Sequence, residues 1–131
     1  MLKQNFLVDD IAIAIKGLGS MEYDFEMGMI ISKYIKAYSI ERQKAISEKK
    51  AILDRYAIKD ENGNSKIENG SITIADGSVE EFKEAISALD TQEVQFAKLP
   101  QYLFHKSKVK PIDMALLLDV FVEADDIDTF L

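Results

Sequence analysis

The sequence predicts a mainly α fold, of the α+β class, in which shorter helices pack on one long helix beside a small β-hairpin. Two observations lead to this prediction. The stretch from Met21 to Lys59 contains no proline and a single glycine, Gly28, and the residues after it hold two Asn-Gly pairs and one Asp-Gly pair. The length of 131 residues and the apolar content of 47% are typical of one folded domain, which we expect to span residues 1–131.

The long helix is predicted over residues 21–58 from the spacing of its apolar side chains. Residues three, four or seven positions apart lie on one face of a helix. The residues that follow this spacing, here called the apolar stripe, are Met27, Ile31, Tyr34, Tyr38, Ala45, Ile52 and Tyr56, with Ile35, Ile46 and Leu53 beside them. At about 1.5 Å per residue the helix would be roughly 50 Å long, so its apolar face needs an extended cover.

The middle of this helix, residues 39–44, is polar except for Ile40, and Glu41 occupies a position of the apolar stripe. One interpretation is a solvated turn of the helix. The other is a polar position that sets the register with a partner helix, as isolated polar core residues do in coiled coils.

A short helix is predicted over residues 7–18, although the I-A-I-A-I run within it also alternates as a strand would. The Asp9-Asp10 pair suits a first helical turn, where the helix macrodipole favours acids. Gly17 and Gly19 are expected to end this helix, and Ser20 is expected to cap the long one.

A β-hairpin is predicted over residues 65–75, with its turn at Asn69-Gly70. A two-residue type I′ turn needs positive φ at both central residues, which Asn and Gly adopt most readily. The segment from Asp60 to Asn64 resembles the start of a calcium loop, but its glycine comes too early and the twelfth position lacks a glutamate. We therefore expect no calcium site.

Two further segments follow the hairpin. Ser78 and Glu81 have the spacing of a capping box, which predicts a helix over residues 78–91. Residues 93–104 alternate and then meet Pro100, which predicts an extended segment or an edge strand.

The last helix is predicted over residues 111–123. Pro111 suits the first helical position, and apolar residues surround nearly the whole helix, which indicates packing on more than one side. The acidic tail, residues 124–131, is expected to fray.

Charge is unevenly distributed along the chain, whose net charge is -7. Residues 33–59 carry eight bases and three acids, residues 60–93 carry nine acids and two bases, and the part after Lys110 carries six acids and no base. One interpretation is that the basic helix and its acidic neighbours face each other or solvent within one fold. The total charge disfavours nucleic-acid binding, although the helix face alone could hold a phosphate backbone.

The composition also limits the cellular setting. The absence of cysteine excludes disulfides and thiolate metal sites. No apolar run approaches the roughly 20 residues that span a bilayer, and the N-terminus lacks the basic-then-apolar order of a signal peptide. We expect a protein that has no membrane association and stays inside a cell.

Several segments together resemble a family of small phage and prophage proteins of unknown function. The resemblance is carried by L-D-R-Y-A-I-K-D-E-N-G from Leu53 to Gly63, E-F-x-x-x-I from Glu81 to Ile86, Glu93-Val94, and L-x-x-F from Leu118 to Phe121. It implies a phage setting, in the cytoplasm of a host bacterium or in the virion. It implies no chemistry and no site residue.

No residue qualifies as a catalytic, cofactor-binding or metal-binding candidate. An enzyme needs a nucleophile or base with an orienting partner, and the single histidine, His105, lies in a basic loop where we expect a surface imidazole. The acid pairs Asp9-Asp10 and Asp125-Asp126 lie at a helix start and in the tail, and adjacent acids on a helix do not face the same site. We therefore expect a non-enzymatic protein.

Protein binding is the function that these observations favour. The acidic blocks could imitate a nucleic-acid backbone and inhibit a host defence nuclease by occluding its basic channel. The alternative is a virion-assembly chaperone or a minor structural component; a small hydrolase or a nucleic-acid-binding protein is least favoured. Because the short helices cannot cover the whole long helix, we also expect a homodimer with antiparallel long helices, weakened by salt.

Overall fold

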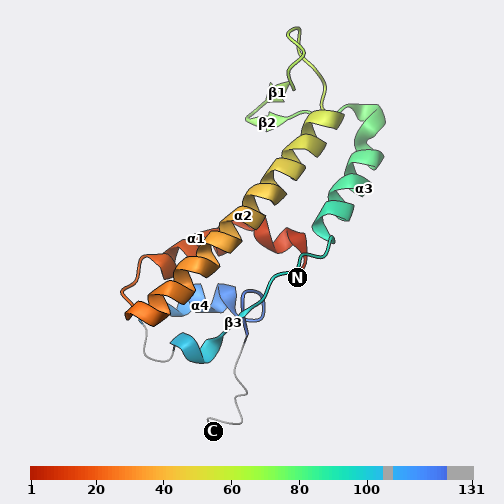
Figure 1. Cartoon of the computed structure of the whole chain (residues 1–131). Coiled ribbons are helices and arrows are strands. Elements are labelled where there is room, and N and C mark those ends of the chain that lie inside the picture. Colours follow the sequence, from red (N-terminus) through yellow and green to blue (C-terminus); the bar gives the residue numbers. More distant parts are fainter. Residues whose placement is uncertain (105–107, 124–131) are drawn as a thin grey trace.

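The computed structural model describes residues 1–104 and 108–123, and its architecture is mainly α with two small two-stranded sheets (Figure 1). The elements in chain order, with η for a 3-10 helix, are η1 (Lys3–Phe6), α1 (Asp9–Gly19), α2 (Phe25–Tyr56), β1 (Ile67–Glu68), β2 (Ser71–Ile72), η2 (Asp76–Ser78), α3 (Val79–Asp90), β3 (Leu99–Pro100), η3 (Gln101–Phe104), α4 (Pro111–Leu117) and β4 (Val122–Glu123). The predicted fold class is confirmed. His105 and the tail 124–131 lie outside the described residues.

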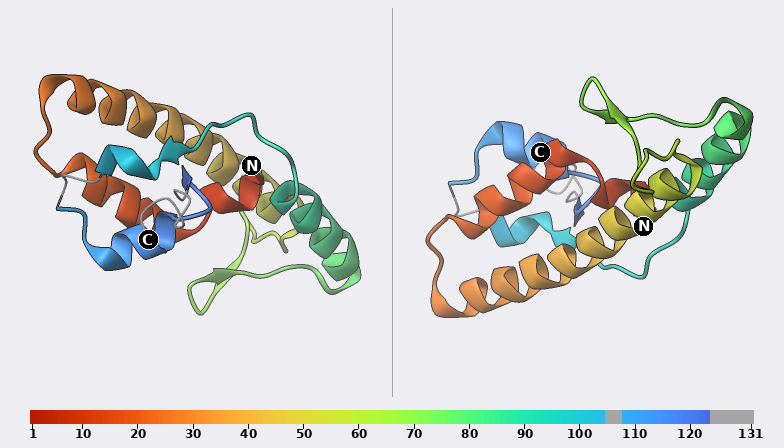
Figure 2. Two further views of the ribbon diagram at one scale, coloured as in Figure 1. Left: turned by 90° about the horizontal axis from the view of Figure 1, so that it is seen from below. Right: turned by 90° about the horizontal axis from the view of Figure 1, so that it is seen from above.

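The long helix α2 begins at Phe25, so the predicted start at residue 21 and the predicted Ser20 cap are wrong. The Asp24 carboxylate accepts a hydrogen bond of 2.8 Å from the Met27 amide, which satisfies one of the free N–H groups at the helix start. Ser20 instead closes α1, because its hydroxyl donates to a carbonyl of the last turn of that helix at 3.1 Å. Residues 20–24 reverse the chain, and α1 packs back against α2 (Figure 2).

The apolar stripe of α2 is buried in its middle, as predicted. Ile31, Tyr38 and Ala45 are 2%, 3% and 0% exposed. The remaining members, Met27, Tyr34, Ile52 and Tyr56, are half-buried. Helix α1 covers the first part of the stripe, η1 contacts its middle, and α3 packs along the last part.

Helix α1 ends at Gly19, one residue from the predicted end, and Gly17 lies in its last turn. The small size of both residues also allows close packing. A Cβ atom at Gly19 would lie 2.8 Å from Cδ1 of Ile35 in α2, and one at Gly17 would lie 3.1 Å from Oδ2 of Asp113 in α4. Helix α1 is therefore in close contact with both α2 and α4.

The predicted hairpin is confirmed, with β1 and β2 paired antiparallel. Both turn residues have positive φ, 52° at Asn69 and 79° at Gly70, as a type I′ turn requires. The chain just after α2 extends this sheet: the Ile58 amide donates to the Thr73 carbonyl at 2.9 Å, and the Lys66 amide donates to the Ile58 carbonyl at 2.7 Å. The hairpin is thereby joined to the end of α2.

Helix α3 starts at Val79, close to the predicted position, but the predicted capping box is not formed. Ser78 makes no side-chain hydrogen bond to the helix start. Its backbone, at φ -112° and ψ 2°, belongs to the turn η2 and lacks the extended conformation of a capping residue. Glu80 and Glu81 still lie in the first turn, where the macrodipole favours acids.

Two elements predicted for the C-terminal part are shorter in the structure than predicted. Residues 93–104 are not one extended segment, because β3 is only two residues long and η3 follows it. The last helix ends at Leu117, and the chain turns through Asp119, with φ 66°, into β4, which pairs in parallel with β3. After this break, Phe121 and Val122 are both fully buried.

The core lies around the first half of α2. The ring centroid of Phe121 lies 5.2 Å from those of Phe6 and Tyr38, and Phe96 meets Phe6 edge-on at 5.1 Å. Among the described residues, the core cluster contains none from the hairpin or α3. Figures 1 and 2 show these elements at the far end of α2, and we call residues 57–90 the distal lobe.

Candidate protein-binding surface

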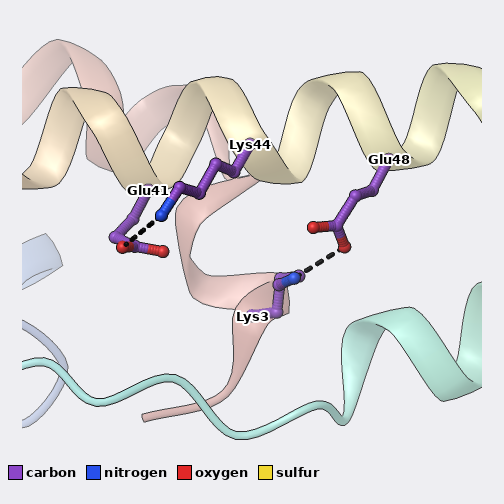
Figure 3. Close-up of polar contacts among 4 residues, drawn as sticks. All are labelled: Lys3, Glu41, Lys44 and Glu48. Atoms are coloured by element: carbon purple, nitrogen blue, oxygen red, sulfur yellow. Dashed lines mark hydrogen bonds and ion pairs between the residues drawn. The ribbon is translucent and has the colours of Figure 1, made fainter.

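Polar residues in the middle of α2 anchor the N-terminal segment (Figure 3). The ammonium group of Lys3, a residue only 6% exposed, lies 2.6 Å from Oε2 of Glu48. Arg42 donates hydrogen bonds of 2.9 Å to the Phe6 carbonyl and to the Asp9 carboxylate. Removing a charge from water is costly unless it is paired, so these contacts hold η1 and the start of α1 in one position on α2.

Glu41 makes no ion pair with another element in the described part of the chain. Its carboxylate lies 3.5 Å from Lys44 of the same helix, and its side chain is 24% exposed (Figure 3). This arrangement agrees with the interpretation of a partly solvated turn. In this stretch of α2, the polar contacts with another element come from Arg42 and Glu48.

Sequence reasoning missed Lys3. Lysine is almost never fully buried unless it is paired, and residues so close to a chain end are ordinarily assumed to be exposed. Its partner, Glu48, lies 45 residues away in the chain, so no local pattern connects the two.

The outer side of the distal lobe is acidic. On α3, Glu80, Glu81 and Glu84 are exposed. Glu80 and Glu84 lie on the side opposite Phe82, whose ring centroid lies 6.3 Å from that of Tyr56 in α2. The exposed acids of the lobe, here called the acidic surface, are Asp60, Glu61, Glu68, Asp76, Glu80, Glu81 and Glu84. Glu68 pairs with Lys66 at 3.0 Å. The exposed glutamates of α3 form no ion pair within the part of the chain that the structure describes.

The exposed lysines of α2 are not paired with the acidic surface. Those without an ion pair among the described residues are Lys33, Lys36, Lys49 and Lys50. The basic helix and the acidic lobe therefore both face solvent. The charge pattern also allowed ion pairs between these lysines and the acidic surface. Within residues 1–104 and 108–123, no such ion pair is formed.

Large apolar side chains are exposed at both ends of the molecule. At the start of α2, Phe25 is 83% exposed and Met29 is 44% exposed. On the distal lobe, Ile67 is 67% exposed and Ile58 is 38% exposed. Exposed apolar groups with a polar surround are typical of surfaces that bind other proteins.

A shallow hollow on α2 lies between these two ends. It is lined by Ser39, Ile40, Gln43, Lys44, Ser47 and Glu48. All of these residues belong to one helix and the hollow is open to solvent, so it does not resemble the concave sites that enclose small ligands.

The acid pairs of the sequence are not brought together as a site. Asp9 and Asp10 are both exposed, and Asp9 pairs with Arg42. Asp125-Asp126 and His105 lie outside the described residues. Within residues 1–104 and 108–123, no group of three or more His, Asp or Glu is placed to hold a metal ion. No helix in the described part of the chain is long and apolar enough to cross a membrane.

The chain matches no protein-family description, no curated protein and no solved structure. The function is therefore inferred from the acidic surface and from the exposed apolar side chains.

Proposed function

We propose that the chain is a non-enzymatic accessory protein of a phage or prophage that binds another protein in the cytoplasm of the host bacterium. The acidic surface is the observation that carries the proposal. Its carboxylates gather on one lobe, and the exposed glutamates of α3 are unpaired among the described residues. A cluster of negative charge attracts a basic partner and raises the rate of association.

A host defence nuclease is the partner that suits this surface best. The nucleic-acid channel of such an enzyme is lined with basic residues that bind phosphates, and the carboxylates of a projecting lobe can take the place of those phosphates. Ile67, 67% exposed on the hairpin, adds an apolar contact among the charges. Protein interfaces commonly combine such an apolar centre with a polar rim.

A role as a virion-assembly chaperone or minor structural component is the second candidate. It is favoured by Phe25 and Met29, whose exposed side chains lie at the opposite end of α2 from the acidic surface. In that role the start of α2 would bind an apolar patch on a virion protein.

The nuclease proposal is tested by adding the purified protein to DNA-cleavage assays with a set of host defence nucleases. We expect inhibition of at least one enzyme. The triple variant Glu80→Gln, Glu81→Gln, Glu84→Gln should inhibit at least about tenfold more weakly, because charge pairs at an interface steer and stabilise binding.

A second triple variant, Asp10→Asn, Glu22→Gln, Glu26→Gln, provides the matched control. It removes the same number of exposed carboxylates outside the distal lobe and should inhibit as strongly as the parent. Equal potency of the α3 variant and the parent would exclude the acidic surface as the binding site. Binding of a purified virion protein that is lost in Phe25→Ser, without nuclease inhibition, would instead support the second candidate.

A further inference from the structure

The hairpin and the loop before it contain two Asn-Gly pairs, Asn62-Gly63 and Asn69-Gly70. In such a pair the glycine amide nitrogen can attack the side-chain carbonyl carbon of the asparagine, because glycine has no Cβ to obstruct the approach. Both pairs are exposed, and a Cβ atom added at either glycine would meet no atom beyond its chain neighbours within 4 Å. Solvent access therefore does not distinguish the two pairs.

Hydrogen bonding distinguishes them. The Gly63 amide donates to the Asp60 carbonyl at 3.1 Å. The Asp60 carboxylate also accepts hydrogen bonds from the amides on either side, at 2.9 Å from Asn62 and 3.0 Å from Asn64. The nitrogen that would attack the Asn62 side chain therefore has its proton bound to a carbonyl oxygen, and this loop must open before the reaction can start.

The Gly70 amide makes no hydrogen bond among the described residues. It belongs to the turn between the paired residues Glu68 and Ser71. Asn69 precedes it with φ at 52°, a conformation that residues other than glycine seldom adopt. Rotation of Asn69 toward the attacking geometry therefore breaks no hydrogen bond of the glycine amide and releases a small backbone strain.

We infer that Asn69 is a site of spontaneous deamidation, at which the protein acquires a carboxylate at the tip of the hairpin. The Gly70 nitrogen loses its proton to hydroxide and bonds to Cγ of Asn69, and the side-chain amide nitrogen leaves as ammonia. Water then opens the cyclic succinimide at either of its carbonyl carbons. The net reaction consumes water, releases ammonia, and gives aspartate or isoaspartate.

The two products affect the hairpin differently. Aspartate tolerates positive φ, so it keeps the turn and adds a charge beside Glu68 in the acidic surface. Isoaspartate adds a methylene group to the backbone, and a two-residue turn lengthened in this way cannot keep Glu68 opposite Ser71. The inference needs no partner and is independent of the proposed function.

Peptide mapping by mass spectrometry, on the full chain incubated at mildly alkaline pH, tests the inference. We expect the mass increase of deamidation to accumulate at Asn69 at least about threefold faster than at Asn62, because opening a hydrogen-bonded amide costs free energy. In urea, which unfolds the chain, the two Asn-Gly pairs should react at equal rates. Deamidation at Asn62 as fast as at Asn69 in the folded chain would overturn the inference, as would an Asn69 that stays intact.

Asp60→Ala removes the side-chain hydrogen bonds that hold the loop, and it should raise the rate at Asn62 several-fold without changing the rate at Asn69. Glu61→Ala is the matched control, since it removes a neighbouring exposed carboxylate that makes no ion pair among the described residues. It should leave both rates unchanged. An equal rise at Asn62 in both variants would contradict the protection of this residue by hydrogen bonds.

Amide hydrogen exchange supplies a second readout. Exchange in residues 65–75 should rise with the isoaspartate content of the incubated protein, whereas Asn69→Asp should exchange as the parent does, because aspartate keeps the turn. An incubated sample that is rich in isoaspartate at residue 69 and exchanges like the parent would contradict the predicted loss of the turn.

Discussion

Tyr34 and Tyr38 lie four residues apart on the same stripe of α2, but their hydroxyl groups have different surroundings. The Tyr34 hydroxyl lies 2.9 Å from the Phe121 carbonyl and 3.1 Å from the Ala97 carbonyl, so it links α2 to the C-terminal part of the chain. The Tyr38 hydroxyl is buried beside Arg42 and has no hydrogen-bond partner of good geometry among the described residues. A buried polar group without a partner is destabilising.

Removing each hydroxyl should therefore have a different effect. Tyr34→Phe leaves the Phe121 and Ala97 carbonyl oxygens each with one contact fewer and is expected to lower the free energy of unfolding by about 1 to 2 kcal/mol. Tyr38→Phe removes an unsatisfied group and should leave stability unchanged or slightly higher. Urea denaturation of the two variants measures the difference. Equal losses in both would show that the Tyr38 hydroxyl has a partner after all.

The same residues predict how stability changes in alkali. Burial raises the pKa of Tyr23, Tyr34 and Tyr38 above the ordinary tyrosine value of 10.0. At a pH above 10 the unfolded chain loses these protons while the folded chain keeps them, so the free energy of unfolding falls as pH rises. The stability that these groups contribute is complete below pH 10.

Melting temperature measured from neutral to strongly alkaline pH checks this expectation. The decrease should begin near pH 10 and be shallower in Tyr34→Phe, because one buried titrating group has been removed. Tyr102→Phe, at a side chain that is 60% exposed, is the control and should follow the parent curve. A flat profile in the parent would contradict the burial of these hydroxyl groups.

At the scale of elements, local sequence patterns predicted correctly those features that depend on residues close together in the chain. The spacing of apolar residues located the buried middle of α2, and Asn69-Gly70 located the hairpin turn. Helix ends were harder. Ser20 and Ser78 both have the chemistry of a cap, but the surrounding turns put Ser20 at the end of α1 and give Ser78 a non-capping backbone.

The break after Leu117 could not be predicted for a different reason. The apolar residues that follow fit a helical pattern, and the alternative becomes favourable only when Phe121 and Val122 are buried against Phe6 and β3. Those contacts come from distant parts of the chain. The blocks of charge did indicate an acidic lobe, whereas the buried Lys3 and the exposed Phe25 emerge only from the packing of whole elements.

The hairpin turn is tested by replacing Asn69 and Gly70 with alanine. Alanine strongly disfavours positive φ, so the double variant should lose about 1 to 2 kcal/mol of local stability. Amide hydrogen exchange should rise through residues 65–75 and change little in α1. An unchanged exchange rate in the hairpin would mean that this turn tolerates alanine without strain.

The apolar stripe is tested by placing a charge at two depths. Tyr38→Asp puts a carboxylate in a position that is 3% exposed and should cost more than about 3 kcal/mol. Ile52→Asp is half-buried beneath the distal lobe and should cost less, because water can still reach part of the new side chain. Thermal melting ranks the two. A larger effect at Ile52 would contradict the position of the core.

At the scale of the whole molecule, the two ends of α2 differ in how well they are packed. Phe121 belongs to the core, whereas Leu89 is the buried residue of α3 and lies outside the core cluster. Opening of the lobe should therefore require less free energy than global unfolding.

Hydrogen exchange in two alanine variants separates these events. Phe121→Ala should lower global stability by about 3 to 5 kcal/mol and speed exchange throughout α1 and α2. Leu89→Ala should speed exchange mainly in α3 and the hairpin, since it loosens the lobe and leaves the core intact. Uniform acceleration in both variants would show that the two ends unfold together.

The contacts around η1 also determine when the chain can fold during synthesis. The Lys3 amide donates to the Gln92 carbonyl at 2.8 Å, and the Phe6 ring packs on Phe121, so the first residues contact the last third of the sequence as well as α2. Contacts between such distant residues are slow to form, because a long loop must close first. On the ribosome, α2 is complete while the C-terminal part of its cover is still being synthesised. The nascent chain therefore carries an exposed apolar stripe, which favours aggregation, until the ribosome releases the segment that contains Phe121.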